Sequence, residues 1–292
     1  MNAAFNSHDR WSAESMRTRV KIIRKFYTLL EKNKLPMTNL IATETGKTIT
    51  DAASEVAATL AKLNNSILAH KKRTGFEKSS YGAMQTSLEH SSHGVMSVVG
   101  PFNFPLHLPN GHITPALVAG NTIVYKPSES TPMVAEYMMM LWEKAGLPAG
   151  VINMIHGGKE IVQGLCKHPL NKGLLFTGSY KVGKQINKIM ADYPEKILAL
   201  ELGGNNPLVV WSTQKINAAV DLIFESAFIS SGQRCTCARR LILPNTKNGN
   251  INEPDIPINI ATTKKNDLIG LTINPKNIYP NITTILFKIP LS

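Results

Sequence analysis

The stretch Gly-Val-Met-Ser-Val-Val-Gly-Pro-Phe-Asn-Phe-Pro, residues 94–105, decides the fold of this chain. Its first half is a short, nearly continuous apolar run, and its second half is a turn stiffened by two prolines. Such a run is typical of a strand that is buried on both faces of a parallel sheet. The turn then lies at the carboxyl end of that strand, which is where parallel sheets bind ligands.

Further short apolar runs follow along the chain, each bounded by Gly, Pro or Ser. They lie at 122–125, 151–155, 173–176, 197–200 and 208–210. Helix-like segments separate them, at 131–145, 181–192 and 214–230. Apolar strands that alternate with helices predict an α/β fold, in which helices cover both faces of a parallel sheet.

The chain before residue 94 has a different pattern. Residues 11–34 predict a helix because their apolar side chains recur at three- or four-residue spacing. These apolar side chains are Val20, Ile23, Tyr27 and Leu30. Residues 38–69 predict a second helical stretch that is broken at Gly46, and residues 71–93 read as a loop or an extended arm.

Composition limits the class of protein. The chain has 292 residues, of which 43% are hydrophobic and 18% charged, and this usage is typical of a globular protein. No apolar run is long enough to span a membrane and the start lacks a secretory signal, so we expect a cytoplasmic protein without a membrane partner. The net charge of +12 comes from scattered basic residues with no nucleic-acid motif, so we expect no nucleic-acid partner.

Two loops carry polar groups at predicted strand ends. The amide of Asn103, in the rigid turn at 100–105, is a suitable fixed donor for an oxyanion, although a plain turn is the alternative interpretation. Lys126 and Glu129 follow the next strand. They are suited to a ribose or a phosphate, and a solvated pair beside a helix cap is the alternative.

A third loop, Phe-Thr-Gly-Ser-Tyr-Lys-Val-Gly at 176–183, joins a predicted strand to a predicted helix. Glycine lets a backbone approach a diphosphate, and the N–H groups at a helix start attract anions. The spacing is neither the usual G-x-G-x-x-G fingerprint nor a Walker loop. Taken alone, this segment is a weak signal for a dinucleotide.

The last pair of segments holds a carboxylate and a thiol. Glu-Leu-Gly-Gly begins at Glu201, and Gly-Gln-Arg-Cys ends at Cys235. Cys235 and Cys237 lack the second cysteine pair or spaced histidine of a zinc site, so we expect no metal. The chain has three cysteines, which argues against a disulfide framework and leaves Cys235 as a candidate nucleophile.

Taken together and in this order, five motifs resemble the aldehyde dehydrogenase superfamily. They are P-F-N-F-P at 101, K-P-S-E at 126, F-T-G-S at 176, E-L-G-G at 201 and G-Q-R-C at 232. The resemblance covers about residues 10–244. It implies a Rossmann-like parallel-sheet NAD-binding domain over residues 1–200, including an arm at 76–93, and the start of an α/β catalytic domain at 201–245.

The resemblance also implies roles for the site residues. Cys235 is the nucleophile that forms a thiohemiacetal and then a thioester, Glu201 activates the hydrolytic water, and Asn103 stabilises the oxyanion. NAD is the cofactor, with Lys126 and Glu129 at its ribose. The stretch beside its diphosphate consists of Gly178, Ser179, Tyr180, Lys181, Val182 and Gly183.

Three segments are similar to one branch of the superfamily, which oxidises N-succinylglutamate 5-semialdehyde in arginine catabolism. They are 107–112, 203–207 and 232–240. Another NAD(P)-dependent semialdehyde dehydrogenase is the alternative. Arg239 and Arg240 could meet a substrate carboxylate or simply be solvated at a helix end.

This chain is shorter than the members of the family that it resembles. In residues 246–292, Asn and Ile supply 18 of 47 residues and prolines interrupt any strand, so we expect an irregular tail outside the family pattern. A truncated product that is poorly active, or a remnant that binds NAD without catalysis, is therefore a second hypothesis. Full-length relatives are expected to be homo-oligomers that act on small aldehydes.

Overall fold

The computed structural model describes residues 1–210, 214–244, 270–273 and 282–288. The chain divides into two compact units, Met1–Leu202 and Gly203–Ser292, called unit 1 and unit 2 below. None of the helices in the described ranges combines the length and the hydropathy that crossing a bilayer requires.

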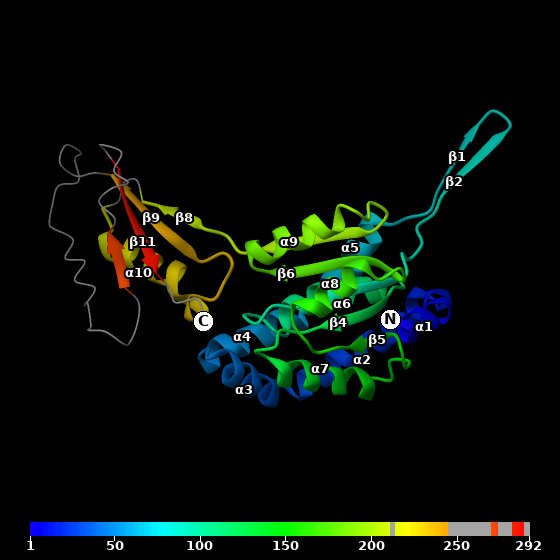
Figure 1. The fold of residues 1–292 in the computed structure, drawn as a ribbon, viewed down its shortest axis with the longest axis horizontal. Helices are drawn as coiled ribbons and strands as arrows, with labels where there is room; N and C mark the ends of the chain where they lie inside the picture. The colour runs from blue at the N-terminus through cyan, green and yellow to red at the C-terminus, as the bar shows by residue number, and fades with distance from the viewer. Residues whose placement is uncertain (211–213, 245–269, 274–281, 289–292) are drawn as a thin grey trace. The chain divides into compact units, whose positions relative to one another are not determined.

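Unit 1 is built on a five-stranded parallel sheet in the order β5-β4-β3-β6-β7 (Figure 1). Its strands are β3 (Val95–Val99), β4 (Thr122–Lys126), β5 (Ile152–Met154), β6 (Asn171–Gly178) and β7 (Ile197–Leu202). The chain runs from β3 outward to β5 and then returns to place β6 on the other side of β3. The parallel α/β sheet predicted from the apolar runs is thus confirmed, with a reversal of strand order between β3 and β6.

Helices cover both faces of this sheet, as the continuous apolar strands require. They are α6 (His107–Val118), α7 (Pro132–Lys144), α8 (Lys159–Lys167) and α9 (Tyr180–Met190). Met96 and Val98 of β3 join the core that includes α6 and α7, whereas Val95 and Val99 join the core that includes α8 and α9. Each face of β3 is therefore buried against a different helical layer.

The sequence pattern does not predict α6. Pro109, Gly111 and Pro115 lie within it, and each of them weakens an isolated helix. The helix forms because Ile113, Leu117 and Val118 are buried in the core, where packing outweighs local propensity.

Five helices precede the sheet. They are α1 (Asn2–Ala13), α2 (Met16–Lys32), α3 (Lys34–Thr45), α4 (Ile49–Leu60) and α5 (Lys62–Arg73). Each contributes to the core that includes α6 and α7, while Ala4 of α1 belongs to the core that includes α8 and α9. The single helix expected at 11–34 is instead divided at Ser15, whose hydroxyl accepts from the Thr18 N–H and caps α2. The break expected at Gly46 is confirmed: this residue has φ 69° and ends α3 in the left-handed conformation.

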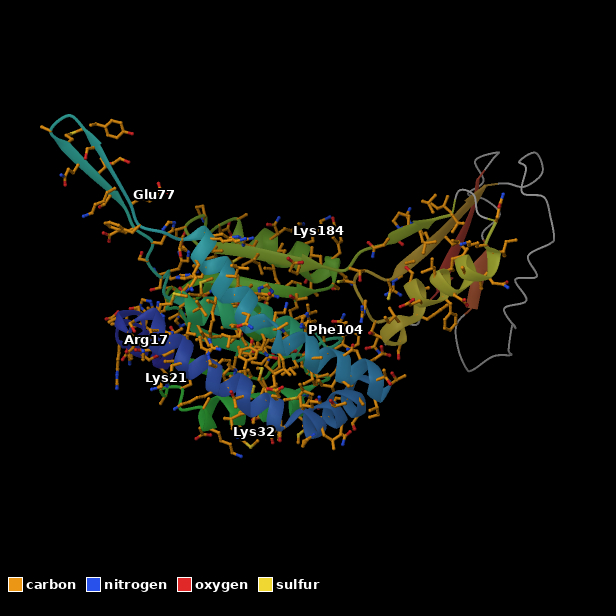
Figure 2. The ribbon with its side chains drawn as sticks, turned by 180° about the vertical axis from the view of Figure 1, so that it is seen from behind. Arg17, Lys21, Lys32, Glu77, Phe104 and Lys184 are labelled. Carbon is orange, nitrogen blue, oxygen red and sulfur yellow. The ribbon has the colours of Figure 1, made fainter. Side chains whose placement is uncertain are left out.

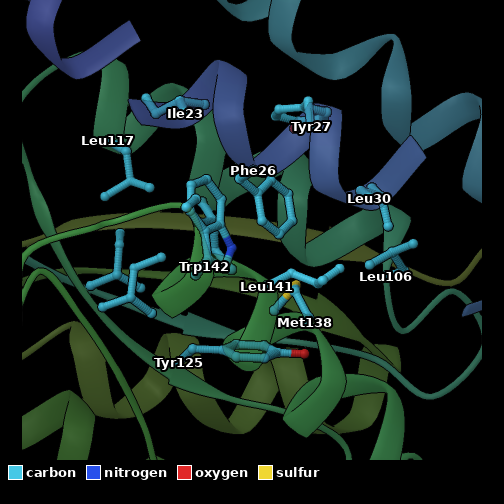
Figure 3. Close-up of a cluster of buried hydrophobic side chains, with 14 of the residues drawn as sticks. Ile23, Phe26, Tyr27, Leu30, Leu106, Leu117, Tyr125, Met138, Leu141 and Trp142 are labelled. Carbon is cyan, nitrogen blue, oxygen red and sulfur yellow. The ribbon is translucent and has the colours of Figure 1, made fainter. Parts of the chain in front are cut away.

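The α2 helix is held to α7 by aromatic packing (Figure 3). The rings of Phe26 and Trp142 are stacked with their centroids 3.7 Å apart and their planes 2° from parallel. The neighbouring Tyr27 hydroxyl lies 2.6 Å from the Thr114 hydroxyl of α6. Polar residues of α2, such as Arg17, Lys21 and Lys32, face outward (Figure 2).

The segment expected to be a loop or an arm is an antiparallel hairpin of β1 (Glu77–Tyr81) and β2 (Met84–Leu88). All ten of its strand residues are exposed, and the hairpin projects from the rest of unit 1 (Figures 1 and 2, where Glu77 is labelled).

Unit 2 has its own small sheet in the order β10-β11-β9-β8 among the described residues. Its elements are β8 (Asn206–Val209), α10 (Ile216–Phe228), the 3₁₀ turn η1 (Ile229–Gly232), β9 (Ala238–Pro244), β10 (Gly270–Ile273) and β11 (Ile282–Lys288). Strands β8 and β9 are parallel, and β11 is antiparallel to β9.

The described parts of the tail differ from the expected irregular structure, because β10 and β11 are strands. The sequence of β11, Ile-Thr-Thr-Ile-Leu-Phe-Lys, is rich in β-branched and aromatic residues, which favour extended structure. The prolines at 254, 257, 275, 280 and 290, on which the irregular prediction depended, all lie outside the described residues.

Candidate functional site

Three of the predicted loops and Glu201 lie at the same edge of the unit 1 sheet. Asn103 follows β3, Lys126 and Glu129 lie at and after the end of β4, the 178–183 stretch follows β6, and Glu201 lies near the end of β7. Since the five strands are parallel, their carboxyl ends lie at one edge. The topology therefore gathers these candidate residues where open α/β sheets bind ligands. Cys235 belongs to unit 2.

The turn that holds Asn103 begins with a close backbone approach. The Gly100 N–H donates to the Lys126 carbonyl at 2.9 Å. A Cβ at position 100 would lie 2.8 Å from the Pro109 ring and 3.1 Å from the Tyr125 ring, so a larger residue does not fit. Gly100 thus lets the Asn103 loop pass between α6 and β4.

Glu201 lies near two polar residues, Thr177 and His112, to which the motifs assign no role. Its register partner on β6 is Thr177, whose hydroxyl is 3.2 Å from Nε2 of His112 on α6. Burial lowers the pKa of His112, the Glu201 carboxylate acts in the opposite direction, and Lys62 of α5 lowers the pKa further. His112 was visible in the sequence only as part of the branch resemblance at 107–112.

Lys126 and Glu129, which the resemblance assigns to a ribose, form an ion pair in the structure. The Lys126 ammonium donates to a Glu129 carboxylate oxygen at 3.0 Å and to the Pro127 carbonyl at 2.6 Å. The Lys126 side chain is 4% exposed whereas that of Glu129 is 58% exposed. The buried Lys126 ammonium holds the exposed Glu129 carboxylate in place. A carboxylate that accepts hydrogen bonds beside an ammonium that donates them is suited to the two hydroxyls of a ribose.

The start of α9 has the features of an anion site. The Ser179 hydroxyl caps the helix by accepting from the Val182 N–H at 3.3 Å, and Tyr180 beside it is 65% exposed. Gly178 and Gly183 leave no room for a Cβ, which would press on the Phe176 ring and on Leu202 respectively. A helix start with such close backbone packing fits a diphosphate, so these residues, together with Lys181, suit a dinucleotide cofactor.

In unit 2, Cys235 is exposed, whereas Cys166 of unit 1 and Cys237 are buried. Burial raises the pKa of the Cys166 thiol. The η1 turn before Cys235 contains Ser230 and Ser231 with φ of 56° and 55°, followed by Gly232 with φ 70°. A left-handed backbone is strained at a non-glycine residue, and such strain is often found where a reactive side chain is presented.

The two arginines after Cys237 have backbone partners within unit 2. The Arg239 guanidinium donates to the Gly232 carbonyl at 2.9 Å, and that of Arg240 donates to the Asn205 carbonyl at 2.9 Å. Both side chains thus connect the start of β9 to neighbouring turns. This role differs from the two interpretations of the sequence, contact with a substrate carboxylate and solvation at a helix end.

Comparisons with known proteins agree with the motifs. A family model described as the aldehyde dehydrogenase family matches residues 1–250. The N-succinylglutamate 5-semialdehyde dehydrogenase of Salmonella agona (strain SL483) is 50% identical over 247 residues, which cover 85% of this chain and 50% of the relative. The chain therefore spans about half the length of the curated relatives it matches.

Solved structures show the same fold. A lactaldehyde dehydrogenase matches with a TM-score of 0.78 and 32% identity over 84% of this chain and 51% of that one. The glyceraldehyde-3-phosphate dehydrogenase of Methanocaldococcus jannaschii, complexed with NADP, matches with a TM-score of 0.75 and 28% identity over 81% and 52%. The predicted resemblance and α/β fold class are confirmed.

Proposed function

Because this chain belongs to the aldehyde dehydrogenase family, we propose that it oxidises N-succinylglutamate 5-semialdehyde to N-succinylglutamate with NAD. The observation that carries the proposal is the 50% identity to relatives of that name, over a stretch that includes every candidate catalytic residue. The sheet topology adds support, since it gathers Asn103, Glu201 and the cofactor residues at one edge.

In the first step, the thiolate of Cys235 attacks the aldehyde carbon, and the carbonyl electron pair moves to oxygen. The side-chain amide of Asn103 and the backbone N–H of Cys235 donate hydrogen bonds to this oxyanion of the thiohemiacetal. One such donor typically stabilises the transition state by roughly 3–4 kcal/mol. A bound nicotinamide would supply the hydride acceptor for this step, and loss of the hydride from the same carbon leaves a thioester on Cys235.

In the second step, Glu201 takes a proton from a water molecule that attacks the thioester carbon. The thiolate leaves, the carboxylic acid product forms, and the proton on Glu201 then passes to solvent. Lys126 and Glu129 would hold the cofactor at a ribose, and the 178–183 stretch would hold it at the diphosphate. The solved structure of a similar protein is a complex with NADP, so the test compares NAD with NADP.

The direct test is reduction of NAD, followed at 340 nm, by the purified 292-residue chain with N-succinylglutamate 5-semialdehyde, beside the full-length Salmonella relative. NADP replaces NAD in a parallel series, and succinate semialdehyde replaces the substrate in another. The proposal requires substrate-dependent NAD reduction that Cys235→Ala abolishes. Turnover of Cys235→Ala within about tenfold of the unaltered chain would contradict the nucleophile. A kcat/KM that is higher for succinate semialdehyde than for N-succinylglutamate 5-semialdehyde would show that the proposed substrate is wrong.

A second candidate function is cofactor binding without turnover. The proposed cofactor residues all belong to unit 1, whereas Cys235 belongs to unit 2, and the chain spans half of its relatives. Isothermal titration of the chain with NAD separates the two functions. Saturable NAD binding with no aldehyde oxidation would establish this candidate, and a Lys126→Met variant that binds NAD as well as the unaltered chain would contradict the proposed cofactor site.

A further inference from the structure

A buried carboxylate on α4 binds the end of the Asn103 loop. Oε1 of Glu55 accepts from the N–H of Leu106 at 3.0 Å and from the N–H of His107 at 3.1 Å. These two residues begin α6, and the first N–H groups of a helix have no partner within it. Glu55 thus caps α6 from a different helix, with its negative charge at the positive end of the helix dipole.

The second oxygen of this carboxylate has a cation as its partner. The Lys47 ammonium donates to Oε2 of Glu55 at 2.8 Å, and both side chains are fully buried. Burial raises the pKa of Glu55, while the Lys47 charge and the hydrogen bonds from Lys47, His107 and Leu106 act in the opposite direction. Lys47 follows the left-handed Gly46, so the end of α3 aims it at the middle of α4.

The same ammonium also contacts the loop directly. Nζ of Lys47 lies 3.5 Å from the centroid of the Phe104 ring, over its face. Phe104, labelled in Figure 2, is the residue next to Asn103. A cation at this distance from an aromatic face is attracted to it, more strongly where water is excluded.

The Asn103 loop is therefore held at both ends and in the middle. Gly100 is bonded to β4 at the start, Phe104 lies beneath Lys47, and Leu106 and His107 are bonded to Glu55 at the end. A buried ion pair is seldom more stabilising than apolar residues of equal size, because both charges must be desolvated. Stability alone therefore does not account for a buried pair at this place.

We propose that Lys47 and Glu55 are positioning residues that hold the side-chain amide of Asn103 where it stabilises the oxyanion formed at Cys235. The inference rests on the proposed function, since it requires that Asn103 be the oxyanion donor. Catalytic positions are sensitive to displacements of about 1 Å, which can change a rate by roughly a hundredfold. Loss of the pair is therefore expected to impair the oxyanion donor even in a protein that stays folded.

The chain offers a matched control for the capping of a helix by a distant carboxylate. The two oxygens of Glu44, on α3, accept from the N–H groups of Met133 and Val134 at 2.9 Å each, at the start of α7. Glu44 thus makes the same kind of contact as Glu55 with a helix that carries none of the proposed catalytic residues. Glu44 is only partly buried, so a Glu44→Gln variant reports what losing a capping charge costs where water is near.

The experiment compares two reactions of the Cys235 thiol in the full 292-residue chain. In acylation by 4-nitrophenyl acetate, the thiolate attacks the ester carbonyl through a tetrahedral oxyanion, and 4-nitrophenolate leaves as the acetyl thioester forms. In alkylation by iodoacetamide, the thiolate displaces iodide from a saturated carbon, and no oxyanion forms. The ratio of the two rates therefore reports the oxyanion donor and cancels differences in thiolate content. Mass spectrometry confirms modification at Cys235, since Cys166 and Cys237 are buried.

Lys47→Met and Asn103→Ala are each expected to lower the acylation-to-alkylation ratio by about tenfold to a hundredfold. Lys47→Arg, which keeps the cation, restores most of the ratio, and Glu44→Gln leaves it unchanged. If Asn103→Ala lowers the ratio but Lys47→Met and Glu55→Gln do not, the positioning role is wrong and the proposed function stands. If Asn103→Ala has no effect, the proposed oxyanion donor is wrong and the positioning role fails with it.

A second measurement follows the loop without any reaction. Hydrogen–deuterium exchange of the peptide containing 100–107 is expected to rise about tenfold in Lys47→Met, while in Glu44→Gln the rise is confined to the peptide containing 133–134. Where Glu55→Gln fails to fold, the double variant Lys47→Met/Glu55→Gln leaves no unpaired charge and takes its place. Unchanged exchange at 100–107 in a folded Lys47→Met protein would overturn the inference, whatever the rate ratio shows.

Discussion

The side-chain amide of Asn206 donates a hydrogen bond of 2.6 Å to the backbone carbonyl of Cys235 and a second of 3.2 Å to the carbonyl of Cys237. Asn206 begins β8, and the two cysteines precede β9, which is the parallel partner of β8. A residue 29 positions earlier in the chain therefore holds the loop that presents the candidate nucleophile.

Replacing Asn206 should loosen this loop. Asn206→Ala removes both hydrogen bonds, and since water can reach the Cys235 carbonyl, the loss is expected to cost about 0.5–1.5 kcal/mol of unfolding free energy. Urea unfolding measures the loss, and hydrogen exchange should increase at 234–238. Asn205→Ala, whose neighbouring side chain is exposed, serves as the control. Equal stability of the two variants would contradict the role of Asn206.

The Glu201 carboxylate is proposed to act after the first hydride transfer. Glu201→Gln should therefore slow steady-state turnover by at least about a hundredfold, while the first turnover still forms NADH. Stopped-flow absorbance at 340 nm would then show a burst of about one NADH per active chain. Glu195→Gln, an exposed carboxylate just before the same strand, should leave both phases unchanged. An unaltered steady state in Glu201→Gln would exclude it as the base.

The left-handed Ser231 stores strain before Cys235. Ser231 is exposed and has φ 55° and ψ 31°, which glycine adopts without the clash of a Cβ. Ser231→Gly is expected to raise the unfolding free energy by about 0.5–1 kcal/mol. Ser231→Ala keeps the Cβ and should give no gain. A Ser231→Gly protein no more stable than Ser231→Ala in urea unfolding would show that this conformation is not strained.

The partly buried His112 should make stability depend on pH. Burial lowers its pKa below the ordinary value near 6.5, so between these two values the unfolded chain binds more protons than the folded protein. The unfolding free energy therefore rises with pH in this window. The contribution of His112 is complete above about pH 6.5 and is lost progressively as the pH falls below it. His112→Gln should flatten this dependence, as measured by urea unfolding between pH 5 and 7.

The influence of Glu201 on His112 can be measured separately. Because the carboxylate partly offsets the lowering of the His112 pKa, Glu201→Gln should move the NMR titration of the His112 ring to a lower pH. Lys62→Met should move it to a higher pH, since Lys62 acts in the opposite direction. A titration that neither variant shifts would show that these three groups do not interact.

The stacked pair of Phe26 and Trp142 should be a major source of stability for unit 1 (Figure 3). Phe26 is fully buried, so Phe26→Ala is expected to cost about 3–5 kcal/mol of unfolding free energy. Phe5→Ala, at a phenylalanine that is 51% exposed, should cost less than about 1 kcal/mol. Equal losses in thermal or urea unfolding would contradict the packing described for α2 and α7.

Much of this protein is determined locally. The continuous apolar runs predict β3, β4, β6 and β7, because a strand buried on both faces needs apolar residues at successive positions. The Gly- and Pro-rich turns after them predict where Asn103, Lys126 and the 178–183 stretch lie, since parallel strands share one carboxyl edge. Five short motifs in order indicate the family, which the comparisons confirm.

Other features depend on contacts between distant parts of the chain, and only the tertiary structure decided them. The α6 helix contains residues that oppose helix formation, and it exists because its apolar side is buried and Glu55, 51 residues before Leu106, caps its start. No motif singles out Lys47 or Glu55, and folding buries both side chains completely. Periodicity reports which side of an element is apolar, but it carries no information about which charge will meet which helix end, because that is set by how the elements pack.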